Sequence, residues 1–193
     1  MAYQNNHGPW NWTVGAFAMD TRLYPGRDQS TGFTDHYTDL GLDASYQHFA
    51  ANHDVVTVNG RYTHERQNLQ ASQALGLVTR SGGYLQDLRI DASYYWRNKI
   101  GLTLQAFDTW GSHDDILYSA NRTLQPDSAG MVLQVDATPY GDGQSPLGRR
   151  FNLRVGVQYT SYFQFDGASR NYDGFGRNAA DNNTLRVFTW IYY

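Results

Sequence analysis

The sequence Leu85-Gln-Asp-Leu-Arg-Ile-Asp-Ala-Ser-Tyr-Tyr-Trp-Arg97 alternates with a period of two. One set of alternate positions is apolar or aromatic: Leu88, Ile90, Ala92, Tyr94 and Trp96. The other set is polar or charged: Asp87, Arg89, Asp91, Ser93 and Arg97. Because successive side chains of a β-strand point to opposite faces, this period predicts a strand with one face suited to hydrocarbon and one that is not.

The same alternation recurs along most of the chain, and almost no stretch has the period of a helix. It predicts eight strands, at residues 10–24, 37–50, 55–66, 84–98, 100–110, 130–140, 151–166 and 184–193. Consecutive strands joined by links indicate an all-β, antiparallel, up-and-down arrangement. The 193 residues suit a single domain that covers positions 1–193.

The mean hydropathy is only −0.61, and no stretch approaches the roughly 20 apolar residues of a membrane-spanning helix. A barrel strand crosses a membrane with about 9–11 residues, of which only alternate ones meet lipid, so a low mean hydropathy is compatible with a membrane barrel. The sequence therefore predicts a transmembrane β-barrel of the bacterial outer-membrane type, surrounded by outer-membrane lipid. A soluble sandwich or barrel, with the apolar face as a shared core, is the alternative.

Two further patterns favour the membrane interpretation. Aromatic residues gather at the ends of the predicted strands, as in the girdles of membrane barrels: Trp10, Trp12, Tyr24, Tyr37, Trp96, Trp110, Tyr140, Trp190, Tyr192 and Tyr193. Long and shorter links also alternate along the chain, which is typical of barrels with long external loops and tight periplasmic turns.

The chain end resembles the C-terminal assembly signal of outer-membrane proteins. Its alternate residues are apolar up to an aromatic last residue, apart from Thr189: Leu185, Val187, Ile191 and Tyr193. The resemblance implies that the barrel-assembly machinery recognises the last strand.

Charged residues on the polar set of positions are predicted to face inward: Asp39, Asp43, Arg61, Glu65, Asp87, Arg89, Asp91, Arg97, Asp136, Arg154 and Arg186. In a closed eight-stranded barrel these residues would interlock as ion pairs and leave no open channel. In a wider barrel they would line water and tune ion selectivity.

Several classes of function have no support. The chain has no Cys, which excludes thiolate metal sites, Cys nucleophiles and covalent haem attachment. The net charge of −3, without a Lys/Arg cluster, offers no surface for nucleic acid. The six histidines lack metal-ligand spacing, and no Ser closely follows Tyr62-Thr-His-Glu65 as a lipase-like site would require. We therefore expect neither a metal nor another cofactor, and no enzymatic activity.

The stretch from Pro126 to Tyr193 resembles the C-terminal end of larger proteobacterial outer-membrane proteins that are described as porin-like. The motifs that carry this are Leu153-Arg-Val-Gly-Val-Gln-Tyr159 and Phe165-Asp-Gly-Ala-Ser-Arg-Asn-Tyr-Asp-Gly-Phe-Gly-Arg-Asn-Ala-Ala-Asp-Asn-Asn183. Some of these proteins are described alongside c-type cytochromes, which implies a sheath around an electron conduit. The resemblance implies further strands before Trp10.

Three functions follow as hypotheses. A channel or conduit sheath is expected if the chain is the C-terminal part of a larger barrel. A complete eight-stranded barrel with a plugged lumen would serve a structural, adhesion or loop-binding role, with a periplasmic or extracellular protein partner still unidentified. A lipid-modifying enzyme is the third alternative.

Overall fold

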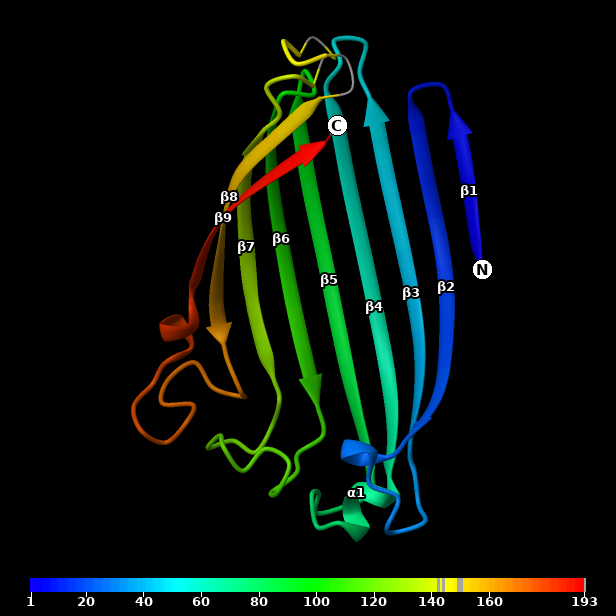
Figure 1. Cartoon of the computed structure of the whole chain (residues 1–193), viewed down its shortest axis with the longest axis vertical. Helices are drawn as coiled ribbons and strands as arrows, with labels where there is room; N and C mark the ends of the chain where they lie inside the picture. The colour runs from blue at the N-terminus through cyan, green and yellow to red at the C-terminus, as the bar shows by residue number, and fades with distance from the viewer. Residues whose placement is uncertain (142, 144, 149–150, 193) are drawn as a thin grey trace.

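A computed structural model describes residues 1–141, 143, 145–148 and 151–192, and it consists of one antiparallel sheet. The strands follow one another in the sheet in chain order (Figure 1): β1 Ala2–His7, β2 Trp10–Leu23, β3 Asp35–Phe49, β4 Val55–Leu69, β5 Gly82–Trp96, β6 Ile100–Gly111, β7 Ser128–Ala137, β8 Asn152–Gln164 and β9 Thr184–Tyr192. Each strand from β2 to β8 pairs with its predecessor and its successor. The all-β, up-and-down arrangement predicted from the alternation is confirmed.

The number of strands was underestimated, because there are nine and not eight. The additional strand is β1, which pairs only with the first half of β2, from Ala2 opposite Gly15 to His7 opposite Trp10. The sheet is open: β1 and β9 each have a single neighbour among the described strands. Closure into a barrel therefore stays a prediction.

Among the residues that the structure describes, helical structure is confined to three short segments in the links: η1 Pro25–Arg27, α1 Gln70–Ala74 and η2 Ala179–Asn182. In the part of the chain that the structure describes, no helix has the length and apolar character needed to cross a membrane.

The links differ between the two ends of the sheet (Figure 1). One end, called here the long-link end, carries residues 24–34, 70–81, 112–127 and 165–183. The opposite, short-turn end carries 8–9, 50–54, 97–99 and 138–151. The predicted alternation of longer and shorter links along the chain is confirmed, because 138–151 is shorter than both of its neighbours, 112–127 and 165–183. It is nevertheless longer than 70–81 at the other end, because β7 ends at Ala137 and not at residue 140.

The long links are braced against one another. The carboxylate of Asp114, in link 112–127, accepts hydrogen bonds from the backbone N–H groups of Thr79 (2.9 Å) and Arg80 (3.3 Å) in link 70–81. The N–H groups of Ile116 and Leu117 also donate to it, at 3.0 and 2.9 Å. Burial alone would raise the pKa of Asp114, but these four donors lower it to about 2. This carboxylate therefore fastens two links together.

The sheet itself has no covered core. Side chains of the apolar alternate positions are largely exposed, including Leu42 (60%), Ile90 (50%) and Val187 (73%). Among the described residues, the fully buried apolar side chains lie at the long-link end or in its links: Leu69, Ala71, Val78, Tyr172 and Ala179. A soluble sandwich would need a second layer over the apolar face, and the described residues contain only this one sheet.

Candidate functional site

The strand register places ten of the eleven predicted inward residues on one face, called here the polar face. Asp43 is opposite Arg61, which is opposite Arg89, and Asp39 is opposite Glu65. Residues directly opposite one another in antiparallel strands project from the same face. The same register and the two-residue period put the remaining members on this face: Asp87, Asp91, Asp136, Arg154 and Arg186.

Arg97 is the exception. β5 ends at Trp96, and Arg97 begins the tight turn 97–99 with a positive φ of 49°. Its backbone N–H donates to Asp54 (2.8 Å), and its guanidinium carbon lies 5.1 Å from the centroid of the Trp96 ring. Arg97 therefore belongs to the turn at the end of the sheet and not to the polar face.

The predicted assembly residues Leu185, Val187 and Ile191 lie on the opposite, apolar face of β9, where Leu185 faces Tyr159 and Val187 faces Val157. Tyr193, the aromatic residue of the same prediction, lies outside the described residues. Recognition by the assembly machinery stays a prediction.

Four glycines on the polar face are covered by an aromatic ring from the directly opposite residue. The pairs are Phe17 over Gly41, Tyr95 over Gly101, Phe107 over Gly130 and Phe188 over Gly156. In each case a Cβ on the glycine would overlap the ring. The absence of a side chain thus allows a large ring to lie flat along the sheet, where it shields the backbone of the glycine.

One ionic cluster spans four strands of this face. Asp136 of β7, whose side chain is fully buried, accepts hydrogen bonds from Nε (2.8 Å) and Nη2 (2.9 Å) of Arg154 in β8. Nη2 of Arg154 also donates to the hydroxyl of Tyr95 in β5 at 2.6 Å, across the strand that carries Gly101. The two-pronged contact and the extra hydrogen bonds are what a buried ion pair needs to offset desolvation.

The contact between Tyr95 and Arg154 also indicates the curvature of the sheet. Their strands are three apart, which corresponds to roughly 14 Å between backbones at about 4.8 Å per strand. The side chains meet because the sheet bends toward the polar face, and Figure 1 shows a curved sheet. The polar face is therefore the concave one, and most of its side chains are half-buried whereas those of the apolar face are exposed.

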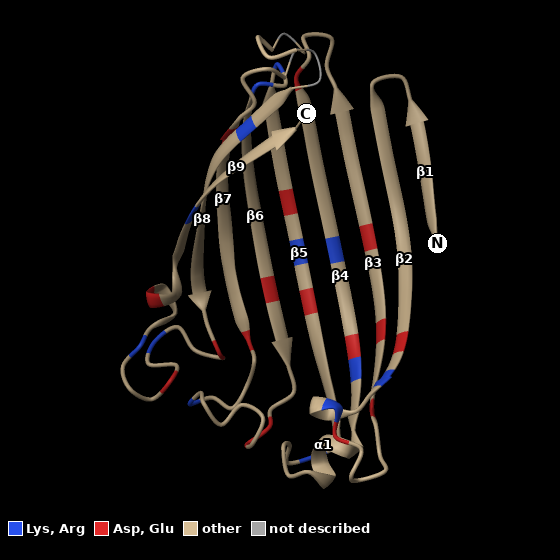
Figure 2. Ribbon diagram, in the orientation of Figure 1, with Lys and Arg blue, Asp and Glu red and all other residues tan. Residues whose placement is uncertain are grey.

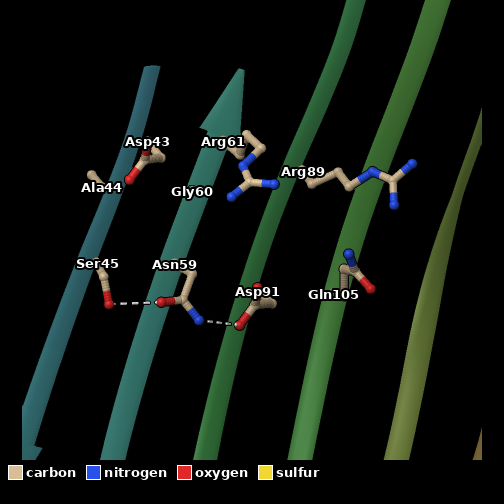
Figure 3. A pocket seen from close by; sticks show the side chains of 9 residues that line it. All are labelled: Asp43, Ala44, Ser45, Asn59, Gly60, Arg61, Arg89, Asp91 and Gln105. Atoms are coloured by element: carbon tan, nitrogen blue, oxygen red, sulfur yellow. Dashed lines mark hydrogen bonds between the residues drawn. The ribbon is translucent and has the colours of Figure 1, made fainter. Parts of the chain in front are cut away.

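A hollow of about 340 Å³ lies on the polar face between β3 and β6 (Figure 3). It is lined by Asp43, Ala44, Ser45, Asn59, Gly60, Arg61, Arg89, Asp91 and Gln105. Some lining groups are already satisfied: Ser45 donates to Asn59 (2.8 Å), Asn59 donates to Asp91 (2.8 Å), and Arg89 binds Asp87 (2.9 Å).

Arg61 and Asp43 remain available in this hollow although they are direct cross-strand partners. Within the described residues, the Arg61 guanidinium donates no hydrogen bond and has no carboxylate within 4 Å. The Asp43 carboxylate leans over Gly15, where an added Cβ would lie 2.8 Å from Oδ1. The guanidinium carbon lies 6.0 Å from the centroid of the Phe17 ring, so the N–H donors of Arg61 and the carboxylate of Asp43 can bind complementary groups of a ligand.

The residues that sequence reasoning missed are Tyr95 and the four glycine and aromatic pairs. Alternation does put Tyr95 and Gly101 on the polar set of positions. Only the register brings them opposite each other, and the sequence by itself does not fix that register. Within the described residues, no three His, Asp or Glu side chains gather as they would around a metal ion.

This chain matches no protein-family model, no curated protein and no solved structure.

Proposed function

We propose that this chain forms part of the wall of an outer-membrane β-barrel that encloses a water-filled channel, with the apolar face toward lipid and the polar face toward the lumen. The role is transport or the sheathing of a conduit, and no catalysis is assigned to it. The observation that carries the proposal is the apolar belt, defined as the exposed apolar and aromatic residues of the convex face.

The height of the belt suits a bilayer. On β5 it extends from Leu88 to Trp96, which are eight residue steps apart. That is roughly 26 Å along the strand and roughly 20 Å across the membrane at a strand tilt of about 40°. Outer-membrane barrels have an apolar band of about 25 Å.

The belt also slants across the sheet. At the long-link side the first charged residue on the apolar face is Asp20 in β2 and Asp108 in β6. The row of paired residues through Asp108 meets β2 at Ala16, four positions before Asp20. A shift of four residues over four strands is one residue for each strand. This is about 3.4 Å along the strand for every 4.8 Å across the sheet, which corresponds to strands tilted by about 35° from the membrane normal. Strands of closed membrane barrels tilt by about 35–45°.

The two free edges support a wall larger than these nine strands. With an odd number of up-and-down strands, β1 and β9 run in the same direction. They cannot complete an all-antiparallel barrel by pairing with each other, so an odd number of further strands is required. A complete eight-stranded barrel, the smaller alternative, does not agree with this strand count.

The test uses the full-length gene product, purified in detergent and added to planar lipid bilayers. We expect steady, large single-channel conductance. Insertion without conductance would refute the channel, and a protein that stays monodisperse without detergent would refute the membrane location.

The same recordings test the hollow. In a salt gradient, Arg61→Gln should shift the reversal potential toward cation selectivity, because it removes a free positive charge from the lumen. Arg61→Lys is the matched control, since it keeps the charge and should keep the reversal potential near that of the unmodified protein.

A further inference from the structure

The apolar belt ends in different chemistry on its two sides. Toward the short-turn end the apolar face of β2, β3 and β5 carries a group of aromatic residues: Trp10, Trp12, Tyr46, Tyr94 and Trp96. Toward the long-link end of β2, β3 and β4, the two rows beyond the belt are polar: Asp20, Thr38 and Arg66, and then Arg22, His36 and Asn68. Figure 2 shows charged residues gathered near these ends of the three strands.

Three basic side chains form what we call the outer basic patch: Arg22, His36 and Arg66. Arg22 is directly opposite His36, and Arg66 is opposite Thr38, which lies two residues after His36 on the same strand. The backbones of Arg22 and Arg66 are therefore roughly 12 Å apart, measured diagonally across the sheet. Two arginine side chains are long enough to reach a common ligand between them.

The two arginines have free donors. Both are exposed, and within the described part of the chain neither guanidinium makes a hydrogen bond or an ion pair. Asp20, the acidic residue of these two rows, is already engaged. It contacts Nε2 of His36 at 2.7 Å and accepts a hydrogen bond from the Thr38 hydroxyl at 3.2 Å.

The position of the patch indicates which ligand it would bind. It lies on the face that carries the apolar belt, immediately beyond the belt, and on the opposite side of the sheet from the lumen. Anionic headgroups at that depth attract Arg and Lys, and guanidinium groups match the oxygens of a phosphate.

We propose that the outer basic patch binds the phosphate of an anionic lipid in the leaflet at the long-link end. This inference rests on the proposed membrane location. It adds that the interface at the long-link end carries a phosphate site over β2 to β4, beside the aromatic side chains of β4 to β6 such as Tyr84 and Trp110.

The test measures the thermal midpoint of the full-length protein in zwitterionic detergent, with added phosphatidylglycerol, phosphatidylcholine or inorganic phosphate at equal concentration. We expect phosphatidylglycerol to raise the midpoint more than phosphatidylcholine does, and inorganic phosphate to leave it unchanged. R22Q/R66Q should lose most of the difference between the two lipids, and R22K/R66K should retain it.

The control R27Q/R170Q makes the same change in net charge at exposed arginines of the long links, and it should keep the lipid preference. Equal shifts with both lipids, an unaltered preference in R22Q/R66Q, or a shift with inorganic phosphate alone would each overturn the lipid site.

A protein that inserts into membranes without any lipid preference would refute this inference and leave the proposed function intact. A protein that needs no detergent would refute the proposed function itself.

Discussion

Among single residues, Asp136 has its counterion in Arg154. Its side chain is fully buried, and both carboxylate oxygens bind Arg154. Arg154→Met would leave a buried carboxylate without its counterion, and we expect a loss of about 3–5 kcal/mol in the free energy of unfolding. Urea titration of the detergent-solubilised protein measures it. The double variant R154M/D136N should recover part of the loss, and no recovery would indicate that packing of the arginine, and not its charge, is what matters.

Glycine positions offer a second residue-scale test. Gly156→Ala places a methyl group against the Phe188 ring, so the ring must leave the sheet, and we expect a loss of about 1–3 kcal/mol. Gly60→Ala on the apolar face is the matched control, because no atom lies within 4 Å of an added Cβ there. Similar unfolding free energies for the two variants would contradict the role assigned to the glycine and aromatic pairs.

Individual charges were easier to predict than their contacts. Ten of the eleven inward residues share a face as alternation requires, because the period of two depends only on the sequence within a strand. The partners of those residues depend on the register between strands. Asp136 and Arg154 were both singled out, but their contact with Tyr95 requires the register of four strands together with the curvature of the sheet.

At the scale of elements, the brace between links 70–81 and 112–127 should respond to acid. The pKa of Asp114 is lowered to about 2 in the folded protein from an ordinary 3.8. The carboxylate therefore stabilises the links above pH 4, and this contribution, on the order of 2 kcal/mol, is lost as the pH falls through 2.

Hydrogen exchange at the amides of Thr79 and Leu117 is the appropriate measurement, because the links can open without unfolding the sheet. Protection should fall between pH 4 and pH 2, after correction for the intrinsic pH dependence of exchange. In Asp114→Asn it should already be low at pH 5 and vary less over that range. Equal protection in both proteins would show that the brace does not depend on this carboxylate.

The strands and helices differ in how well the sequence predicts them. Eight strands were located within a few residues of their ends because each has a sustained apolar and polar alternation. β1 was missed because Ala2–His7 has almost no apolar residues, and only the hairpin turn at Gly8, with φ 58°, marks it. α1 was missed because its five residues are too few to display a helical period.

The two faces of the whole sheet lead to opposite expectations for neighbouring residues. Leu104→Arg puts a charge in the middle of the apolar belt, which we expect to cost about 2–4 kcal/mol in a bilayer and to reduce folding into vesicles. Thr103→Arg, one residue earlier on the polar face, should fold into vesicles nearly as well as the unmodified protein. Heat-modifiable migration on gels distinguishes folded from unfolded chains. Equal folding of the two variants would contradict the assignment of the faces.

The outer edge of β2 bears on the order in which the proposed wall can be built. Among the described residues, β1 accompanies β2 from Trp10 to Gly15, and beyond the two hydrogen bonds between Ala16 and Met1 no strand lies beside that edge up to Leu23. Backbone N–H and C=O groups left open in hydrocarbon cost several kcal/mol each, because lipid tails offer them no hydrogen bonds. In the proposed membrane location, a neighbouring strand should therefore pair with this edge before β2 leaves water, or while it does so.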